Sequence, residues 1–183
     1  DRELLGNIQL EIPGAHNVQN ALLVVALGMD LGIPFSQIAS ALSSFRGAKR
    51  RFELKYGDAE IRVFDDYGHH PTEIAATLAT ARKVQGNEGR VIVLFQPHRY
   101  TRTAALASEF GPSFRESDIL FVAPVYAAGE SPIPGINSGT IARSARDAGH
   151  ASVLEVGSVA GAVHDVASVL REGDLVLTLG AGN

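Results

Sequence analysis

The feature that most constrains the fold is an alternation of short apolar segments with longer ones of helical character, which begins at residue 61. The short segments, of four or five residues, are rich in Val, Ile, Leu and Phe and are predicted as strands. Short apolar strands that alternate with helices are typical of a parallel sheet covered on both faces. We therefore expect an α/β domain. The predicted strands are 61–64, 91–95, 119–123, 153–156 and 175–179, and the predicted helices are 72–84, 104–114, 140–148 and 159–170.

The first part of the chain has a different pattern. Residues 4–14 alternate like one short strand, and residues 17–31 predict a helix of Ala, Leu and Val that we expect to be buried on most sides. A second helix is predicted to begin at Pro34. Since a strand and two helices are too little for a core of their own, we expect residues 1–48 to be the end of a preceding domain and residues 49–183 to form the next one.

Composition excludes several classes of protein. The absence of Cys excludes a disulfide scaffold, a thiolate zinc site and a Cys nucleophile. The net charge of −4 gives no support to nucleic-acid binding. No run of 18 apolar residues and no export signal are present, so we expect a cytoplasmic protein that does not insert into a membrane.

Ionisable residues cluster where the first predicted strand ends, and ligands of open parallel sheets bind at the carboxyl ends of the strands. Residues 65–71, DDYGHHP, directly follow strand 61–64. Asp65 and His70 could simply satisfy backbone groups, with Pro71 beginning the helix. Because the segment holds more ionisable groups than capping requires, we favour a site for ribose hydroxyls, a divalent cation, or both.

The next strand ends in a basic cluster. Residues 96–102, QPHRYTR, follow strand 91–95, and Arg99 and Arg102 lie three residues apart beside His98. Guanidinium groups bind carboxylates or phosphates with two hydrogen bonds, so this spacing predicts an anion site. The alternative is that Arg102 is a solvated helix residue and Arg99 belongs to a surface ion pair, which the neighbouring acidic loop makes less favoured.

Weaker indications come from other segments. The loop 124–130 and the glycine run 180–182 follow two further strands, but a plain turn explains either. The basic residues 49–51, followed by a strand-like ELK, suit a polyphosphate, unless they are a solvated linker. Asn17 and Asn20 lie one turn apart on a predicted helix and could bind the edge of a purine, although Asn17 could also be the N-cap.

Taken in order, these segments closely resemble the Mur ligase family. The likeness covers essentially the whole chain, and its most specific part is the pair DDYGHHPTE and FQPHRYTR. It implies a three-domain, ATP-dependent ligase that forms an amide bond through an acyl-phosphate intermediate during peptidoglycan precursor synthesis. Residues 1–48 would then end the central ATP-binding domain, and residues 49–183 would be the Rossmann-like C-terminal domain, with a mostly parallel sheet and helices on both faces. The matching segments are GAHNVQNALLVVALG, FRGAKRRFEL, DDYGHHPTEI, FQPHRYTRT, VYAAGESPIPG and LTLGAG.

The resemblance also implies substrates and residue roles. The substrates would be ATP, UDP-N-acetylmuramate and L-alanine, with Mg²⁺ held mainly by residues outside this chain; no catalytic residue and no metal ligand is assigned here. The family's GTxGK[ST] phosphate loop does not occur in the 183 residues, so we expect this chain alone to be inactive. The residues implied for the nucleotide are His16, Asn17, Asn20, Arg50, Arg51 and Asp66. Those implied for the other substrates are Tyr67, His69, Arg99 and Arg102.

Three alternatives remain open. The first is a murein-tripeptide recycling ligase of the same superfamily, which shares an HHP loop but for which we expect a different sequence in place of FQPHRYTR. The second is a non-catalytic nucleotide-binding module. The third is a metal-dependent hydrolase. Its ligands would be Asp65, Asp66, His69, His70 and His98.

Overall fold

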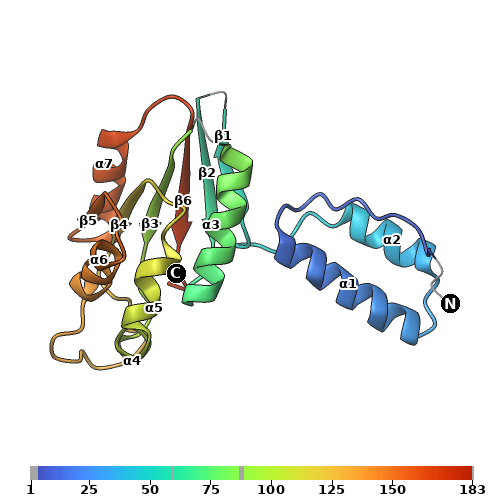
Figure 1. The fold of residues 1–183 in the computed structure, drawn as a ribbon, viewed down its shortest axis with the longest axis horizontal. Coiled ribbons are helices and arrows are strands. Elements are labelled where there is room, and N and C mark those ends of the chain that lie inside the picture. The colour runs from blue at the N-terminus through green and yellow to red at the C-terminus, as the bar shows by residue number, and fades with distance from the viewer. Residues whose placement is uncertain (1–3, 59, 87–88, 183) are drawn as a thin grey trace. The chain divides into compact units, whose positions relative to one another are not determined.

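The chain forms two compact units, Asp1–Ala48 and Lys49–Asn183 (Figure 1). A computed structural model describes residues 4–58, 60–86 and 89–182. Among these residues, no helix combines the length and the hydrophobicity that a membrane crossing requires.

The second unit is built on a six-stranded sheet with the order β1-β2-β6-β3-β4-β5. Only the edge strand β1 is antiparallel to its neighbour, and all other pairs are parallel. The predicted α/β fold with a mostly parallel sheet is therefore confirmed. The strands are β1 (Glu53–Gly57), β2 (Ile61–Asp66), β3 (Val91–Phe95), β4 (Ile119–Val122), β5 (Val153–Glu155) and β6 (Asp174–Leu179).

Helices cover both faces of this sheet, as predicted (Figure 1). The larger core lies between the sheet and α3 (Pro71–Gln85), α5 (Ala107–Ser113) and α6 (Ser138–Asp147). The smaller core lies under α7 (Val159–Val169) on the other face.

The single helix predicted over 104–114 is wrong, because it is divided at Leu106 into α4 (Tyr100–Ala105) and α5. The division accompanies close packing of α5 on α6. At Gly111 a Cβ atom would collide with the carbonyl oxygen of Ser144, so the close approach of α5 to α6 requires a glycine here.

The first unit contains α1 (Ala15–Asp30) and α2 (Phe35–Ser44). They pack closely at Gly28, where a Cβ atom would lie 2.7 Å from Cδ1 of Ile38. The strand predicted over 4–14 is wrong: within the described part of this unit, no extended segment pairs with it, and a strand needs a neighbouring ladder.

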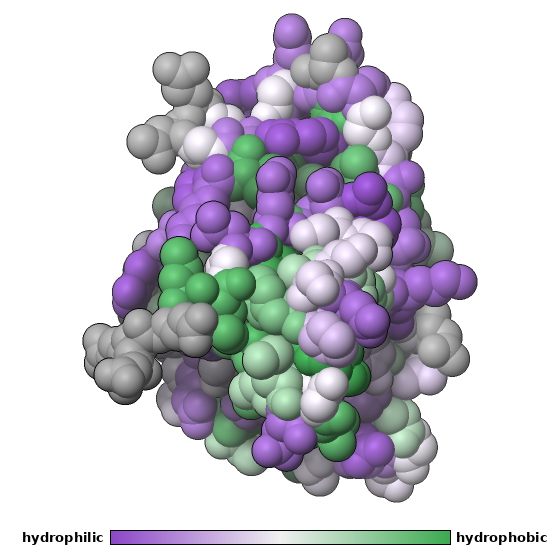
Figure 2. Space-filling model, turned by 90° about the vertical axis from the view of Figure 1, so that its right-hand side faces the viewer, coloured by the Kyte–Doolittle hydropathy of each residue, from purple (hydrophilic) through white to green (hydrophobic). Residues whose placement is uncertain are grey.

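The predicted burial of the first helix on most sides is also wrong. Only Gly28 of α1 is buried, while Leu22, Leu23 and Leu27 are 61–69% exposed. Two helices share a single contact face, so the remaining apolar side chains of α1 stay at the surface. Apolar residues are visible among polar ones in Figure 2.

Candidate functional site

The polar loops predicted from the sequence meet at one edge of the sheet, the one formed by the carboxyl ends of its parallel strands. The adjacent parallel strands β2, β6, β3 and β4 all end there. The loops that follow them begin at Tyr67, Gly180, Gln96 and Ala123, so residues distant in the sequence become neighbours.

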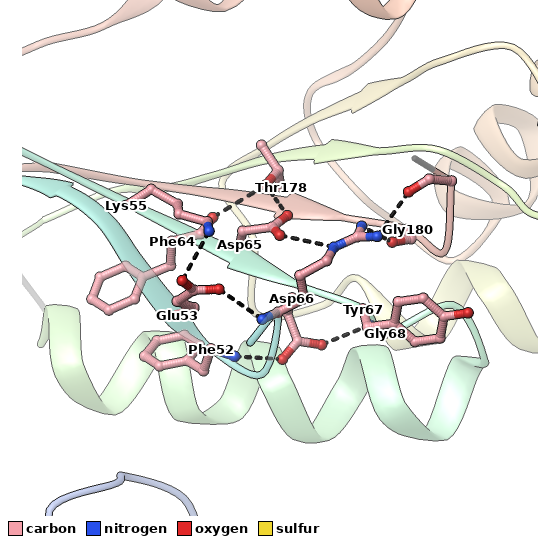
Figure 3. A network of polar contacts seen from close by, with 12 residues as sticks. Phe52, Glu53, Lys55, Phe64, Asp65, Asp66, Tyr67, Gly68, Thr178 and Gly180 are labelled. Carbon is pink, nitrogen blue, oxygen red and sulfur yellow. Dashed lines mark hydrogen bonds and ion pairs between the residues drawn. The ribbon is translucent and has the colours of Figure 1, made fainter. Parts of the chain in front are cut away.

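The two carboxylates of the first loop do not act together. Strand β2 runs two residues further than predicted, so Asp65 and Asp66 are strand residues that point to opposite faces of the sheet. Asp66 is only 4% exposed. Its carboxylate accepts hydrogen bonds from the backbone N–H of Phe52 and of Gly68, both at 2.7 Å (Figure 3). It also accepts one from Oγ1 of Thr77 at 3.3 Å. Asp66 therefore organises the start of this domain and its own loop.

Gly68 is required beside this carboxylate. A Cβ atom at this position would lie 2.8 Å from Oδ1 of Asp66. The absence of a side chain lets the loop turn tightly enough for the Gly68 N–H to reach the buried carboxylate.

On the other face, Asp65 and Arg50 join the beginning of the domain to its end. Nε of Arg50 lies 3.0 Å from Oδ2 of Asp65, and the two Nη groups donate to the carbonyl oxygens of Gly180 and Gly182. Oγ1 of Thr178 donates to Asp65 at 2.6 Å (Figure 3). The guanidinium predicted to bind the nucleotide is thus bound to protein groups on three sides.

These residues form one wall of a cleft of about 470 Å³ beside the glycine loop. The polar groups of this wall are already hydrogen-bonded to one another, and most of the other lining residues are apolar. The lining residues are Arg50, Asp65, Leu94, Gln96, Val159, Thr178, Leu179, Gly180 and Gly182.

Arg51 is the more accessible of the two arginines implied for the nucleotide. Its side chain is 54% exposed, and its nearest acidic partner, Glu73, lies 3.9 Å away. The guanidinium carbons of Arg50 and Arg51 lie 5.2 and 5.8 Å from the centre of the Tyr67 ring. Both cations therefore lie against a half-exposed phenol, and Arg51 keeps donors for an anionic ligand.

Four aromatic or imidazole rings connect the loops of β2, β3 and β4. The Tyr67 and His69 rings meet edge to face at 5.2 Å, the His69 and His98 centroids are 5.6 Å apart, and His98 stacks on Tyr126 at 5.6 Å. The structure thereby brings Tyr67 and His69 next to the loop that carries the two predicted arginines.

His98 is held as a neutral acceptor for Arg102. Burial first, and then the positive charges of Arg102 and its neighbours, lower the pKa of His98 below its ordinary value of 6.5. Nη1 of Arg102 lies 3.1 Å from Nδ1 of His98, so the neutral imidazole carries its proton on Nε2. Arg99 is exposed and caps α4 with its backbone in the left-handed region, at φ 71°. The structure thus fixes the Arg102 guanidinium and leaves that of Arg99 at the surface.

His70 satisfies a backbone group at the start of α3, which is the simpler of the two interpretations of this residue. Its Nδ1 accepts a hydrogen bond from the N–H of Thr72, and Pro71 is the first residue of α3. Glu73 completes a capping box by accepting from the N–H groups of His69 and His70. Burial raises the pKa of Glu73, but these N–H groups and nearby positive charges outweigh it and leave the pKa below its ordinary value.

The geometry gives no support to the metal-dependent hydrolase. In residues 4–58, 60–86 and 89–182, no three His, Asp or Glu side chains are placed to hold one metal ion. Asp65 and Asp66 lie on opposite faces, and His70 caps a helix.

The three residues predicted to bind adenine lie in the first unit. Asn17 is not the N-cap of α1, because that position is taken by Gly14; its Nδ2 instead donates to the carbonyl oxygen of Pro13 at 2.6 Å. Asn20 is exposed and His16 is partly buried. Their roles stay predictions.

Comparison with known proteins decides the family. The sequence profile described as "Mur ligase, glutamate ligase domain" matches residues 50–182. The chain belongs to the Mur ligase family.

Relatives of this Mur ligase chain agree with that assignment. UDP-N-acetylmuramate–L-alanine ligase of Desulforapulum autotrophicum is 47% identical over 182 residues, which cover 100% of this chain and 40% of the relative. The crystal structure of UDP-N-acetylmuramate-alanine ligase from Thermotoga maritima matches with a TM-score of 0.76 and 33% identity, over 96% of this chain and 36% of that one. A murein peptide ligase from Psychrobacter arcticus matches with a TM-score of 0.67 and 26% identity, over 96% and 36%. The chain thus spans about two fifths of the length of the curated relatives.

Sequence reasoning missed three side chains that connect these loops: Glu73, Tyr126 and Glu130. Glu73 stands at the third position of a helix that begins at Pro71, which is a capping-box signal. Tyr126 and Glu130 lie on the loop after β4, which the sequence marked only as a possible turn. An aromatic and an acidic residue in a loop suggest a possible role, but only the fold shows that Tyr126 and Glu130 contact residues after β3.

Proposed function

We propose that this chain is the C-terminal part of an ATP-dependent ligase that joins L-alanine to UDP-N-acetylmuramate in peptidoglycan precursor synthesis. The observation that carries the proposal is 47% identity, across the whole chain, to a relative named for that reaction. The likeness to a murein peptide ligase is lower, at 26% identity, which makes the recycling ligase the second candidate.

We propose that Arg99 and Arg102 orient the carboxylate groups of the substrates. Both belong to the loop and short helix after β3, and guanidinium groups suit carboxylates. Neutral His98 supports this role because it accepts from Arg102 without adding positive charge. The Tyr67 ring contacts His69, and the His69 ring contacts His98 on the loop of the two arginines, which forms a row of rings. We therefore propose that Tyr67 and His69 also line the substrate site.

For the nucleotide, we propose that Arg51 approaches the phosphates, because its guanidinium is the exposed one. Arg50 and Asp66 would act mainly by shaping the site, since their polar atoms already hold the domain together. A carboxylate accepts about four hydrogen bonds, so a ribose hydroxyl would have one remaining position on Asp66. We further propose that residues 1–48 end the ATP-binding domain, with His16, Asn17 and Asn20 near the adenine.

The described residues do not offer a donor set for Mg²⁺. We therefore propose that its ligands come from parts of the protein outside this chain.

The expected chemistry is phosphoryl transfer from ATP to the sugar-linked carboxylate, which releases ADP and forms an acyl phosphate, followed by attack of the alanine amine, which expels phosphate and forms the amide bond. The contribution of this chain is to place carboxylates and to stabilise negative charge that develops during attack. Fixed cationic groups at a protein site are effective in that role because they need no rearrangement during the reaction.

The test is ADP release by the full-length protein with each substrate omitted in turn. The proposal predicts release only when ATP, UDP-N-acetylmuramate and L-alanine are all present. Faster turnover with the murein tripeptide than with alanine would favour the recycling ligase. Binding of nucleotide without any turnover would favour the non-catalytic module. Stoichiometric zinc in protein purified without chelators, with hydrolysis and no ligation, would favour the hydrolase.

A further inference from the structure

The loop after β4 is bonded to the loop that carries Arg99. The N–H of Arg99 donates to the carbonyl oxygen of Tyr126, and the N–H of Tyr126 donates to that of Pro97, both at 2.8 Å. A parallel bridge pairs His98 with Tyr126, and their rings stack at an angle of 19°. The pairing of β3 and β4 therefore continues past the ends of both strands.

Arg99 adopts a conformation that needs this support. Its φ of 71° lies in the left-handed region, which residues with a Cβ atom occupy mainly where surrounding structure holds them. Besides the bond from its N–H to Tyr126, its carbonyl oxygen accepts from N and Oγ1 of Thr103, at 3.1 and 2.8 Å. Arg99 is thus fixed on both sides, by the β4 loop and by α4.

Glu130 completes the connection at the start of α4. Its carboxylate accepts from the backbone N–H of Thr101 at 3.0 Å and from Oγ1 of Thr101 at 2.6 Å. The first N–H groups of a helix lack partners within the helix, and Arg99, as N-cap, supplies no side-chain acceptor. Glu130 takes that place from 29 residues away.

The conformation of the β4 loop presents this carboxylate. The N–H of Glu130 closes a turn on the carbonyl oxygen of Ala127 at 3.0 Å. Ala128 and Gly129 between them have φ values of 49° and 85°. The bonds from the Thr101 hydroxyl and N–H lower the pKa of Glu130, so the group that meets α4 is the carboxylate.

We propose that Glu130 is a positioning residue of the ligase site: through Thr101 it fixes the start of α4, and thereby the directions of Arg99 and Arg102. This inference rests on the substrate role proposed above for the two arginines. Glu130 acts through Thr101 and not on the reacting atoms, so its loss should weaken substrate placement without affecting the nucleotide.

The experiment compares Glu130→Ala with Glu130→Gln in the full-length protein. A glutamine can keep both contacts, since its amide oxygen can accept from the Thr101 N–H and its amide nitrogen can donate to the hydroxyl. Glu130→Ala should raise the KM for L-alanine or UDP-N-acetylmuramate about ten- to hundredfold, the range expected when reacting groups are misplaced, with the KM for ATP unchanged. Glu130→Gln should recover most of the loss.

Hydrogen–deuterium exchange of the peptide spanning residues 98–106, read by mass spectrometry, supplies a measurement that does not depend on the reaction. Exchange should be faster in Glu130→Ala and near wild type in Glu130→Gln. The matched control is Glu109→Ala, because Glu109 is exposed on α5 and its carboxylate makes no bond within the described residues. This control should change neither kinetics nor exchange.

Unchanged KM values and unchanged exchange in Glu130→Ala would overturn the inference. Glu130→Gln as impaired as Glu130→Ala, with slow exchange in both, would also overturn it, because Glu130 would then act through its charge on a substrate. If the wild-type protein shows no alanine-dependent ADP release, the proposed function fails. The exchange comparison still decides the role of Glu130 in that case: faster exchange in Glu130→Ala supports it, and unchanged exchange refutes it.

Discussion

Replacing Asp66 with asparagine should destabilise the second unit, because the buried carboxylate serves three donors. One oxygen accepts from the N–H of Phe52, and the other accepts from the N–H of Gly68 and the hydroxyl of Thr77. In asparagine one of these two atoms becomes an NH₂ group, so at least one buried N–H loses its acceptor whichever way the amide turns.

The expected loss follows from that count. A hydrogen bond to a charged group contributes about 1.5–3 kcal/mol, so Asp66→Asn should lower the free energy of unfolding by at least that amount. Since the free energy of unfolding falls by about 1–3 kcal/mol per M of urea, the urea concentration at the midpoint of unfolding should fall by about 1 M. Thr77→Val is the matched control: it removes only the 3.3 Å bond, the longest of the three, and leaves both N–H groups with their acceptor, so it should cost less than Asp66→Asn.

The assay is equilibrium urea unfolding of the 183-residue chain, combined with the KM for ATP in the full-length protein. A variant Asp66→Asn as stable as wild type, with a large increase in the KM for ATP, would refute the reasoning. Asp66 would then be a ligand for the ribose first, and the three contacts would contribute little to the fold.

Three further predictions concern substrates, the nucleotide and pH. Arg102→Ala should raise the KM for alanine or the nucleotide sugar about ten- to hundredfold, since losing a charged hydrogen bond costs about 1.5–3 kcal/mol, and Arg102→Lys should recover little; a change in the KM for ATP alone would contradict this. The 183-residue chain alone should release no ADP, and calorimetry should give a dissociation constant for ATP no lower than about 1 μM, or −8 kcal/mol. Either ADP release or tighter binding would show that the nucleotide site is misplaced. Burial lowers the pKa of His150 below its ordinary 6.5, so the unfolded state binds more protons and the free energy of unfolding should fall as the pH decreases below about 6.5. In urea unfolding at several pH values, His150→Gln should reduce this dependence, and an unchanged slope would assign it to another group.

The sheet could be predicted because its parallel strands are buried on both faces, which leaves continuous apolar runs in the sequence. Strand β1 lies at the exposed edge, where Leu54 and Tyr56 face solvent, so its sequence lacked such a run and only the letters ELK indicated it. Residues 4–14 show the opposite case, since an alternating pattern without a partner does not form a strand.

The meeting of the polar loops could be predicted, because adjacent parallel strands place their carboxyl ends at the same side of the sheet. The separation of Asp65 from Asp66 could not, because it depends on β2 extending two residues past its apolar run. The bond between Glu130 and Thr101 joins positions far apart in the sequence and exists only once β3 and β4 lie side by side.

The most direct test is a crystal structure of the full-length protein with UDP-N-acetylmuramate and a non-hydrolysable ATP analogue. We predict that the muramoyl carboxylate lies within hydrogen-bonding distance of Arg99 or Arg102, beside the row of rings from Tyr67 to His98. We also predict that Arg51 approaches the phosphates. A carboxylate bound away from the ends of β2 and β3, with Arg99 and Arg102 both free in solvent, would contradict the assignment of this edge of the sheet as the ligase site.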